Sequence, residues 1–239
     1  MDKLKTGAER LGIKLGEREL TLFQAYYEEL VDWNRRINLT SITGYEEVQV
    51  SHFLDALTVV LACQPDSVNG RVIDVGTGAG IPGLPLKIVF PQIQLVLLEA
   101  TGKKANFLRH VIGKPGLSDV VVVAGRAEEV AHQQQYREQF DVALSRGVAP
   151  LATLVELTLP FCRPGGLVIA HKKGEISEEL SRAVYAIDAL GGRVKVVVPV
   201  DMPEFTDKRC LVVIEKANPT PPRYPRRPGM PAKRPLGGK

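Results

Sequence analysis

The chain has few of the residues that build disulfide frameworks or metal sites. Its 239 residues include three cysteines, which are far apart and form no CxxC pair, and four histidines without the HExxH spacing of a zinc enzyme. No apolar run approaches the ~18 residues of a membrane span, and the N-terminus, MDKLKTGAERLG, lacks the apolar stretch of a secretion signal. These absences predict a cytoplasmic protein without a metal, a membrane segment or a disulfide.

The charge of the chain is unevenly distributed. Residues 1–215 contain 24 basic and 27 acidic residues, whereas residues 216–239 contain seven basic residues, no acidic residue and seven of the 17 prolines. A basic, proline-rich segment is predicted to be extended rather than helical. Such a tail either lies along a phosphate backbone or is simply solvated, and composition does not separate these two interpretations.

Helical periodicity comes first along the chain. Apolar positions recur at helical spacing in 17–37, and a second amphipathic helix is expected at 47–62. The run CQPDSVNG at 63–70 then marks a loop. We therefore place an N-terminal helical extension at 1–66, a larger domain at 67–217 and the basic tail at 218–239.

Short β-branched runs alternate with helical stretches beyond that loop. Near-continuous apolar strands separated by helices predict a mainly parallel sheet that is covered on both faces. The last two runs are joined by the non-helical link VDMPEFTDK and should pair antiparallel. A mostly parallel seven-stranded α/β sheet that ends in an antiparallel hairpin is the outline of a class I, Rossmann-like methyltransferase. The expected strands are 71–75, 94–100, 119–125, 140–146, 166–172, 193–199 and 209–216, and the expected helices are 83–90, 102–113, 127–136, 149–161 and 175–190.

The clearest local signal is VIDVGTGAGIPGLPL at 72–86, in which Gly76, Gly78 and Gly80 follow an apolar strand and precede a helix. Glycines permit positive φ and leave no Cβ between the backbone and a ligand. In an open α/β sheet, ligands bind beyond the carboxyl ends of the strands. The sequence therefore predicts a cofactor site at this loop.

Two kinds of cofactor fit the loop. The frame GAGIPG at 78–83 satisfies GxGxxG, which leaves a nicotinamide or flavin dinucleotide open. Asp74, just before the first glycine, favours S-adenosylmethionine instead, because a carboxylate receives an ammonium group and repels a pyrophosphate. Glu99 ends the second strand, where it is placed to accept hydrogen bonds from the ribose hydroxyls of either cofactor.

The later strand ends indicate the chemistry. Ala127 and Glu128 follow the third strand, where an adenine would lie, and Arg146 ends the fourth, beside the reacting methyl group. That fourth strand end lacks both the Asn/Asp-Pro-Pro-aromatic motif of amine methylation and the cysteine nucleophile of pyrimidine carbon-5 methylation. A ring nitrogen such as guanine N7 needs neither, because its lone pair is free and carries no proton. We predict a catalytic role for Arg146, with its paired donors directed at O6 and N7 of guanine.

Taken together, seven blocks of the sequence resemble the bacterial 16S ribosomal RNA guanine-N7 methyltransferases of the RsmG family, formerly called glucose-inhibited division protein B. The blocks run in order along nearly the whole chain: ELVDWNRRINLTSIT (29–43), HFLDALT (52–58), VIDVGTGAGIPGLPL (72–86), EATGKKANFL (99–108), GRAEE (125–129), FDVALSRGVAPL (140–151) and PPRYPRRPGMPAKRPL (221–236). The resemblance implies S-adenosylmethionine as methyl donor and a guanine in the decoding-region loop of 16S ribosomal RNA as acceptor, in naked RNA or in the small ribosomal subunit. We expect no protein partner.

The resemblance also implies which residues contact the cofactor. Position by position, the family's contacts fall on Gly76, Ile81, Glu99, Ala100, Thr101, Gly102, Ala127, Glu128 and Arg146. To these we add Asp74 and Gly78 from the glycine loop. Ile81 stands where the family usually has Phe, so an aliphatic wall replaces an aromatic one.

Segments 38–40 and 52–55 match motifs of the family's helical extension. They either bind RNA or act as helix caps and local side-chain pairs, with His52 and Asp55 paired across one turn.

The sequence leaves three functions open. The first is an RNA methyltransferase whose extension, tail and lysines bind RNA. The second is a NAD- or FAD-dependent oxidoreductase, and the third is a non-catalytic RNA-binding ribosome-assembly factor that kept the fold.

Overall fold

The computed structural model of the chain describes residues 1–63, 70–113 and 116–237. The expected boundary between residues 66 and 67 and most of the expected loop at 63–70 lie outside the described residues. Within the described ranges, no helix is long and apolar enough to cross a membrane.

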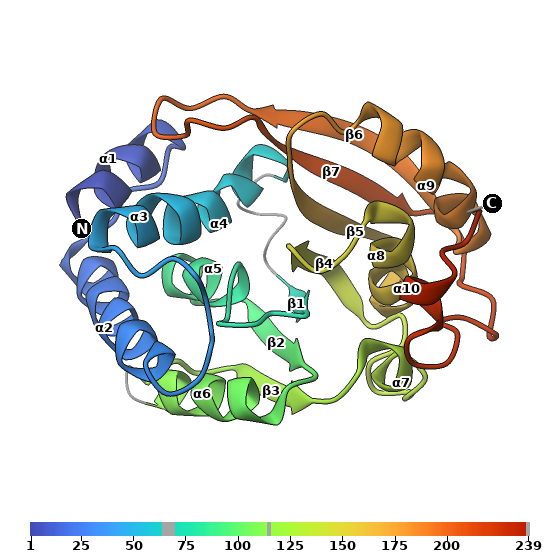
Figure 1. Cartoon of the computed structure of the whole chain (residues 1–239), viewed down its shortest axis with the longest axis horizontal. Coiled ribbons are helices and arrows are strands. Elements are labelled where there is room, and N and C mark those ends of the chain that lie inside the picture. The colour runs from blue at the N-terminus through green and yellow to red at the C-terminus, as the bar shows by residue number, and fades with distance from the viewer. Residues whose placement is uncertain (64–69, 114–115, 238–239) are drawn as a thin grey trace.

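A seven-stranded sheet with the order β3-β2-β1-β4-β5-β7-β6 forms the centre of the molecule (Figure 1). Strands β1 to β5 pair in parallel, and β7 is antiparallel to both β5 and β6. This confirms the predicted fold class, a mostly parallel sheet that ends in an antiparallel hairpin. The strands are β1 (Arg71–Val75), β2 (Gln94–Glu99), β3 (Val120–Ala124), β4 (Phe140–Arg146), β5 (Cys162–Lys173), β6 (Gly192–Val200) and β7 (Arg209–Lys216).

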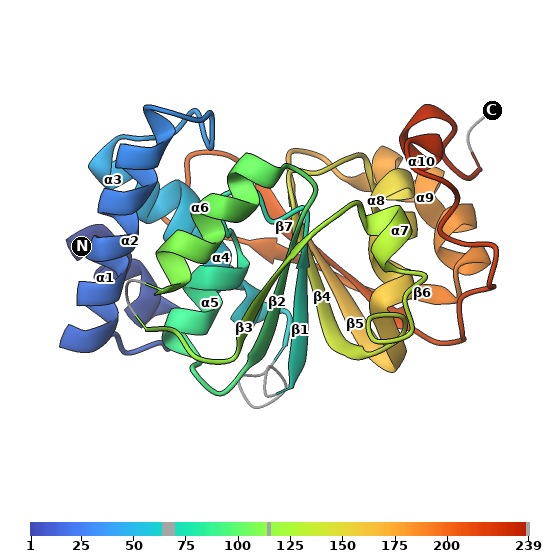
Figure 2. The same ribbon diagram turned by 90° about the horizontal axis from the view of Figure 1, so that it is seen from below.

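Helices cover both faces of the sheet because successive side chains of a strand point to opposite faces. In β1, Val72 packs into one apolar cluster and Ile73 into the other. Figure 2 shows the sheet nearly edge-on, with α5 and α6 on one side and α7, α8 and α9 on the other. These helices are α5 (Gly83–Val89), α6 (Gly102–Gly113), α7 (Ala127–Val130), α8 (Leu151–Thr158), the 3-10 turn η4 (Leu159–Phe161) and α9 (Ser177–Ala189).

The helices that precede the sheet cover the same face as α5 and α6. Phe23 and Phe53 have ring centroids 5.0 Å apart and lie in one apolar cluster with Val72 and Leu97 of the sheet. The helical extension and the sheet therefore share one core. The extension consists of α1 (Asp2–Arg10), α2 (Glu17–Asn34), α3 (Tyr45–Val48), the π-helix η1 (Gln49–Leu54), α4 (Asp55–Leu57) and the 3-10 helix η2 (Thr58–Leu61).

Three of the expected helices are shorter or less regular than the sequence predicts. The helix expected at 17–37 ends at Asn34, because the Asn34 side chain accepts hydrogen bonds from the backbone of Leu39 and Thr40 and turns the chain. The helix expected at 47–62 is a run of short helices around a π-turn. The helix expected at 127–136 is confined to α7, after which the chain continues in turns.

The C-terminal tail also differs from the expected extended segment. It folds back beside α7 and α8 and contains a short helix, α10 (Met230–Lys233) (Figure 2). Its Tyr224 is only 6% exposed and belongs to the apolar cluster under α8 and α9. The tail is thus packed against the domain and is neither extended nor simply solvated.

Candidate functional site

The glycine loop lies where the strand order reverses between β1 and β4, which is the expected ligand position in an open α/β sheet. Gly76, Gly78 and Gly80 all have positive φ, at +70°, +60° and +93°. A Cβ on Gly76 would lie 2.7 Å from Val148, whereas a Cβ on Gly78 would meet nothing within 4 Å. The backbone at Gly78 is therefore strained for other residues and open on its outer side, as a cofactor cradle requires.

Asp74 lies beneath the loop and not in the cavity above it. Its Oδ2 accepts hydrogen bonds from the Thr77 hydroxyl at 2.6 Å and the Gly83 backbone N–H at 2.8 Å, so it fixes the loop's shape. Its Oδ1 is buried without a partner among the described residues. Burial raises the pKa of Asp74 to about 6, because the charged carboxylate is removed from water.

Glu99 ties the glycine loop to the end of β2. Its Oε2 accepts from the Gly78 backbone N–H at 2.9 Å, and its Oε1 accepts from the Thr101 backbone N–H at 2.7 Å. Ala100, Thr101 and Gly102 are exposed beside it. The carboxylate is therefore held at the mouth of the loop, next to the strand end where a ribose is predicted to bind.

A cavity of about 700 Å³ opens above the glycine loop, within the usual range of small-molecule sites. Four of the predicted site residues line it: Gly76, Gly78, Ile81 and Arg146. The others lie on adjoining strand ends or below the loop: Asp74, Glu99, Ala100, Thr101, Gly102, Ala127 and Glu128. Register places Glu99 opposite Ala124, so Glu99 and the start of α7 occupy neighbouring strand ends. Residues of the helical extension line the opposite wall, among them Thr40, Ser51, His52, Asp55 and Thr58.

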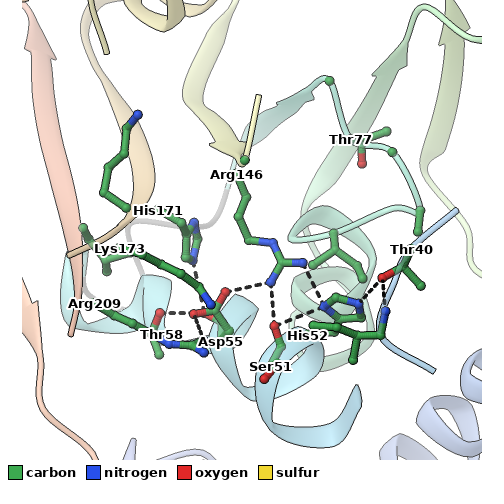
Figure 3. Close-up of a pocket in the computed structure, with 18 of the residues that line it drawn as sticks. Thr40, Ser51, His52, Asp55, Thr58, Thr77, Arg146, His171, Lys173 and Arg209 are labelled. Carbon is green, nitrogen blue, oxygen red and sulfur yellow. Dashed lines mark hydrogen bonds and ion pairs between the residues drawn. The ribbon is translucent and has the colours of Figure 1, made fainter. Parts of the chain in front are cut away.

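Asp55 joins the extension to three strands of the sheet (Figure 3). Its Oδ2 accepts from Arg146 Nη1 at the end of β4, and its Oδ1 accepts from Arg209 Nη1 at the start of β7, both at 2.7 Å. Its backbone carbonyl accepts from His171 Nε2 of β5 at 3.1 Å. Asp55 is 4% exposed. Burial alone raises the pKa of such a carboxyl, but the neighbouring charges of His171, Arg146 and Arg209 outweigh it and the pKa of Asp55 is lowered.

The π-turn of the extension contributes to this contact. Ser51 lies within η1, and its backbone carbonyl accepts from Arg146 Nη1 at 2.7 Å. Single π-turns are rare and often occur at functional sites, because they alter which backbone groups bond within the helix. Here the turn places a backbone acceptor next to the carboxylate of Asp55, so two acceptors share one guanidinium nitrogen.

His52 is a neutral acceptor for Arg146. Arg146 Nη2 donates to His52 Nδ1 at 2.9 Å, and since a guanidinium only donates, this contact requires an Nδ1 without a proton. The Ser51 carbonyl, 3.1 Å from the same nitrogen, then lies beside it without receiving a proton from it. The other ring nitrogen then donates to the Thr40 hydroxyl oxygen at 2.9 Å. Burial, together with the charge of Arg146, lowers the pKa of His52 to about 4. The expectation that His52 and Asp55 pair with each other is wrong, because both bind Arg146 instead.

The buried neutral state of His52 predicts a loss of stability in mild acid. Between pH 6.5 and 4 the unfolded chain binds a proton at this position and the folded chain does not, so the free energy of unfolding falls as the pH falls. From pH 7 to pH 5 the loss should be about 2 kcal/mol larger in the unsubstituted protein than in His52→Gln. Urea denaturation of both proteins at the two pH values measures it. Asp74, whose raised pKa acts in the opposite direction, is present in both proteins and cancels. Equal pH dependences would show that the pKa of His52 is not lowered in the folded protein.

Several cavity residues were not anticipated from the sequence, and two of them contact Asp55. Arg209 and His171 come from the antiparallel strand β7 and from β5, and neither lies in a motif near the glycine loop. The only sequence signal that reaches them is the block HFLDALT, through Asp55. Cys210 also lines the cavity, and burial raises the pKa of its thiol, so it is protonated and is no nucleophile for carbon-5 methylation. Across residues 1–63, 70–113 and 116–237, no group of three or more His, Cys, Asp or Glu residues is arranged to hold a metal ion.

Comparisons with known proteins agree with this geometry. The chain is 53% identical over 238 residues to the ribosomal RNA small subunit methyltransferase G of Dehalococcoides mccartyi strain CBDB1, which covers 99% of this chain and 100% of the relative. It is 49% identical over 236 residues to the protein of the same name from Roseiflexus castenholzii, with 99% and 100% covered.

Solved structures support the fold alone. A mutant of MtNAS in complex with S-adenosylmethionine matches with a TM-score of 0.55 and 18% identity, over 83% of this chain and 73% of that chain. TrmN from Thermus thermophilus matches with a TM-score of 0.51 and 19% identity, over 70% of this chain and 53% of that chain.

A family model described as GidB, rRNA small subunit methyltransferase G, matches residues 19–206. The chain therefore belongs to the GidB family, the rRNA small subunit methyltransferase G proteins.

Proposed function

We propose that the protein transfers the methyl group of S-adenosylmethionine to N7 of a guanine in the decoding-region loop of 16S ribosomal RNA. The observation that carries this proposal is the family match, which spans most of the chain and extends over the full length of its relatives. Family membership argues against the oxidoreductase alternative, for which the GAGIPG frame was the only support. With ribosomal RNA as substrate, the cytoplasm is the compartment that follows.

The residues present fit the methyl donor. Gly78 offers a backbone with open space beside it, and Ile81 supplies an apolar wall. Glu99 and Glu128 are acceptors on neighbouring strand ends, where a ribose and an adenine amine would need them. S-adenosylmethionine supplies a methyl group that is already activated for transfer, so the protein's own residues need only bind and orient the two reactants.

Arg146 faces the cavity as a fixed donor. Its Nη1 and Nη2 are held by Asp55, Ser51 and His52, and its Nε–H donates to no residue in the part of the chain that the structure describes. We assign the remaining donor capacity of Arg146 to O6 of guanine and not to N7 as the sequence suggested, because the N7 lone pair must stay free to attack the methyl group. Since N7 carries no proton, neither the neutral His52 nor the protonated Cys210 is needed as a base.

The test is to incubate the protein with labelled donor and small ribosomal subunits, and separately with naked 16S RNA. Chemical cleavage at N7-methylguanine then maps the labelled base. Label at one guanine N7 of the decoding-region loop is the expected result, and Arg146→Met should abolish most of it. Label on another base would contradict the assignment. If the RNA stayed unlabelled both in small subunits and as naked 16S RNA, the non-catalytic assembly factor would be the remaining function.

A further inference from the structure

The tail is anchored to the domain by charged side chains that its composition alone does not reveal. Arg137, in the turns after α7, donates through Nη1 to the carbonyl of Tyr224 and through Nη2 to the carbonyl of Thr220, both at 2.9 Å. Arg226 forms a two-pronged pair with Glu156 of α8, with Nη2 to Oε2 at 2.6 Å and Nε to Oε1 at 2.9 Å. Glu156 is 0% exposed. A buried carboxylate without this partner would be costly, so the pair holds the tail in place.

The anchored tail reaches one of the residues predicted to contact the cofactor. The Gly229 backbone N–H donates to Oε1 of Glu128 at 2.9 Å, and Gly229 has φ +81°, a conformation that favours glycine. Glu128 is 8% exposed, and among the described residues its carboxylate accepts from Gly229. Gly229 is therefore the donor that fixes this carboxylate, and it leaves Oε2 as an acceptor.

Glu128 needs outside support because of its position. It lies in α7, a helix of only four residues that is followed by turns, so its own element restrains it little. α10 packs against α8 beside it, and the Thr153 hydroxyl of α8 donates to the carbonyl of Pro231 at 3.1 Å. Figure 2 shows α10 at the same end of the molecule as the top of α7 and α8.

We propose that the docked tail positions Glu128 to accept a hydrogen bond from the exocyclic amine of the cofactor's adenine, so that the tail belongs to the methyl-donor site. Gly229 is then a positioning residue: it acts on the cofactor through Glu128. This inference rests on the proposed function, in which Glu128 contacts the cofactor. It assigns the tail to donor binding, whereas a tail that lies along RNA phosphates would act on the acceptor.

The experiment compares two truncations by the Kd for S-adenosylmethionine. Ending the chain after Arg227 removes Gly229 and α10 but keeps the Arg226 pair and the Arg137 contacts, whereas ending it after Arg234 keeps Gly229 as well. The shorter chain should bind about tenfold more weakly, the size of one hydrogen bond to a charged acceptor, and the longer one should bind normally. Arg226→Met should weaken binding in the same direction, and Arg227→Met, whose side chain is exposed, should not.

Combining each change with Glu128→Ala separates positioning from general damage. If the tail acts through Glu128, truncation after Arg227 adds nothing further once Glu128 is alanine. Additive effects, or an unchanged Kd after truncation, overturn the proposal. An unchanged Kd in Glu128→Ala alone would instead remove Glu128 from the cofactor site. A Kd that is unchanged by truncation, together with a flatter salt dependence of RNA binding, would assign the tail to phosphate contact.

Discussion

Replacing Asp55 by Ala should lower the free energy of unfolding by about 3–5 kcal/mol, because removing one partner of a buried ion pair leaves the other charge unpaired. Here Arg146 loses its only carboxylate among the described residues and keeps the neutral acceptors Ser51 and His52, whereas Arg209 loses one of two carboxylates and keeps Asp207. The side chain of Arg209 is 6% exposed, and Arg146 is also largely buried, so neither guanidinium regains full hydration. Urea denaturation at pH 7 measures the loss. Methyl transfer should fall even where the protein is folded, because Arg146 would no longer be aimed at the cavity.

An exposed ion pair provides the control for Asp55→Ala. Glu175 pairs with Lys208 on the surface, where both side chains are largely in water, so Glu175→Ala should leave the free energy of unfolding unchanged within error. Asp55→Asn tests the charge itself, since it keeps the shape of the side chain and one acceptor oxygen. Wild-type stability in Asp55→Ala would show that the two arginines are not held by this carboxylate.

Replacing Glu99 by Ala should raise the Kd for S-adenosylmethionine about fivefold to 150-fold, which corresponds to about 1–3 kcal/mol for a lost charge-assisted hydrogen bond. Two effects act together. In the proposed binding mode the ribose would lose its acceptor, and the backbone N–H groups of Gly78 and Thr101 lose the oxygen that orients the two loops. Isothermal titration calorimetry gives the Kd directly.

Glu99→Gln separates these two effects. Its amide keeps one acceptor oxygen but presents an NH₂ group to the other position, where a backbone N–H already points, so one of the two loops is released. The expected Kd lies between those of the unsubstituted protein and Glu99→Ala. A Kd for Glu99→Ala equal to that of the unsubstituted protein, in a protein whose thermal unfolding shows it to be folded, would place the ribose elsewhere.

The sheet was predictable from the sequence because its signals are local. The apolar runs at 71–75, 140–146 and 209–216 coincide with β1, β4 and β7 residue for residue. The positive φ values of Gly76, Gly78 and Gly80 follow from a glycine cluster between a strand and a helix. Periodicity and turn chemistry act over a few residues, so one sequence is enough to read them.

Contacts between residues far apart in the chain could not be predicted, because they produce no local pattern in the sequence. The pairing of Asp55 with Arg209 joins residues 154 positions apart, and the HFLD block suggested only a partner within one turn. The docking of the tail was missed for the same reason: its proline and arginine content resembles that of a solvated segment, while the residues that hold it, Glu156 and Arg137, lie in other elements. Composition reports what a segment contains and not which buried carboxylate it will meet.

The apolar cluster shared by the helical extension and the sheet limits how far these two parts of the protein can move relative to each other during the reaction. Interiors packed at crystal-like density resist deformation, so the wall that carries Asp55 cannot swing far from the wall that carries Gly78. The nucleic acid must then supply the conformational change, with the target guanine leaving its stacked position to enter a crevice that is already shaped. A loop of RNA, whose bases unstack at small cost, suits such a rigid enzyme better than a continuous duplex does.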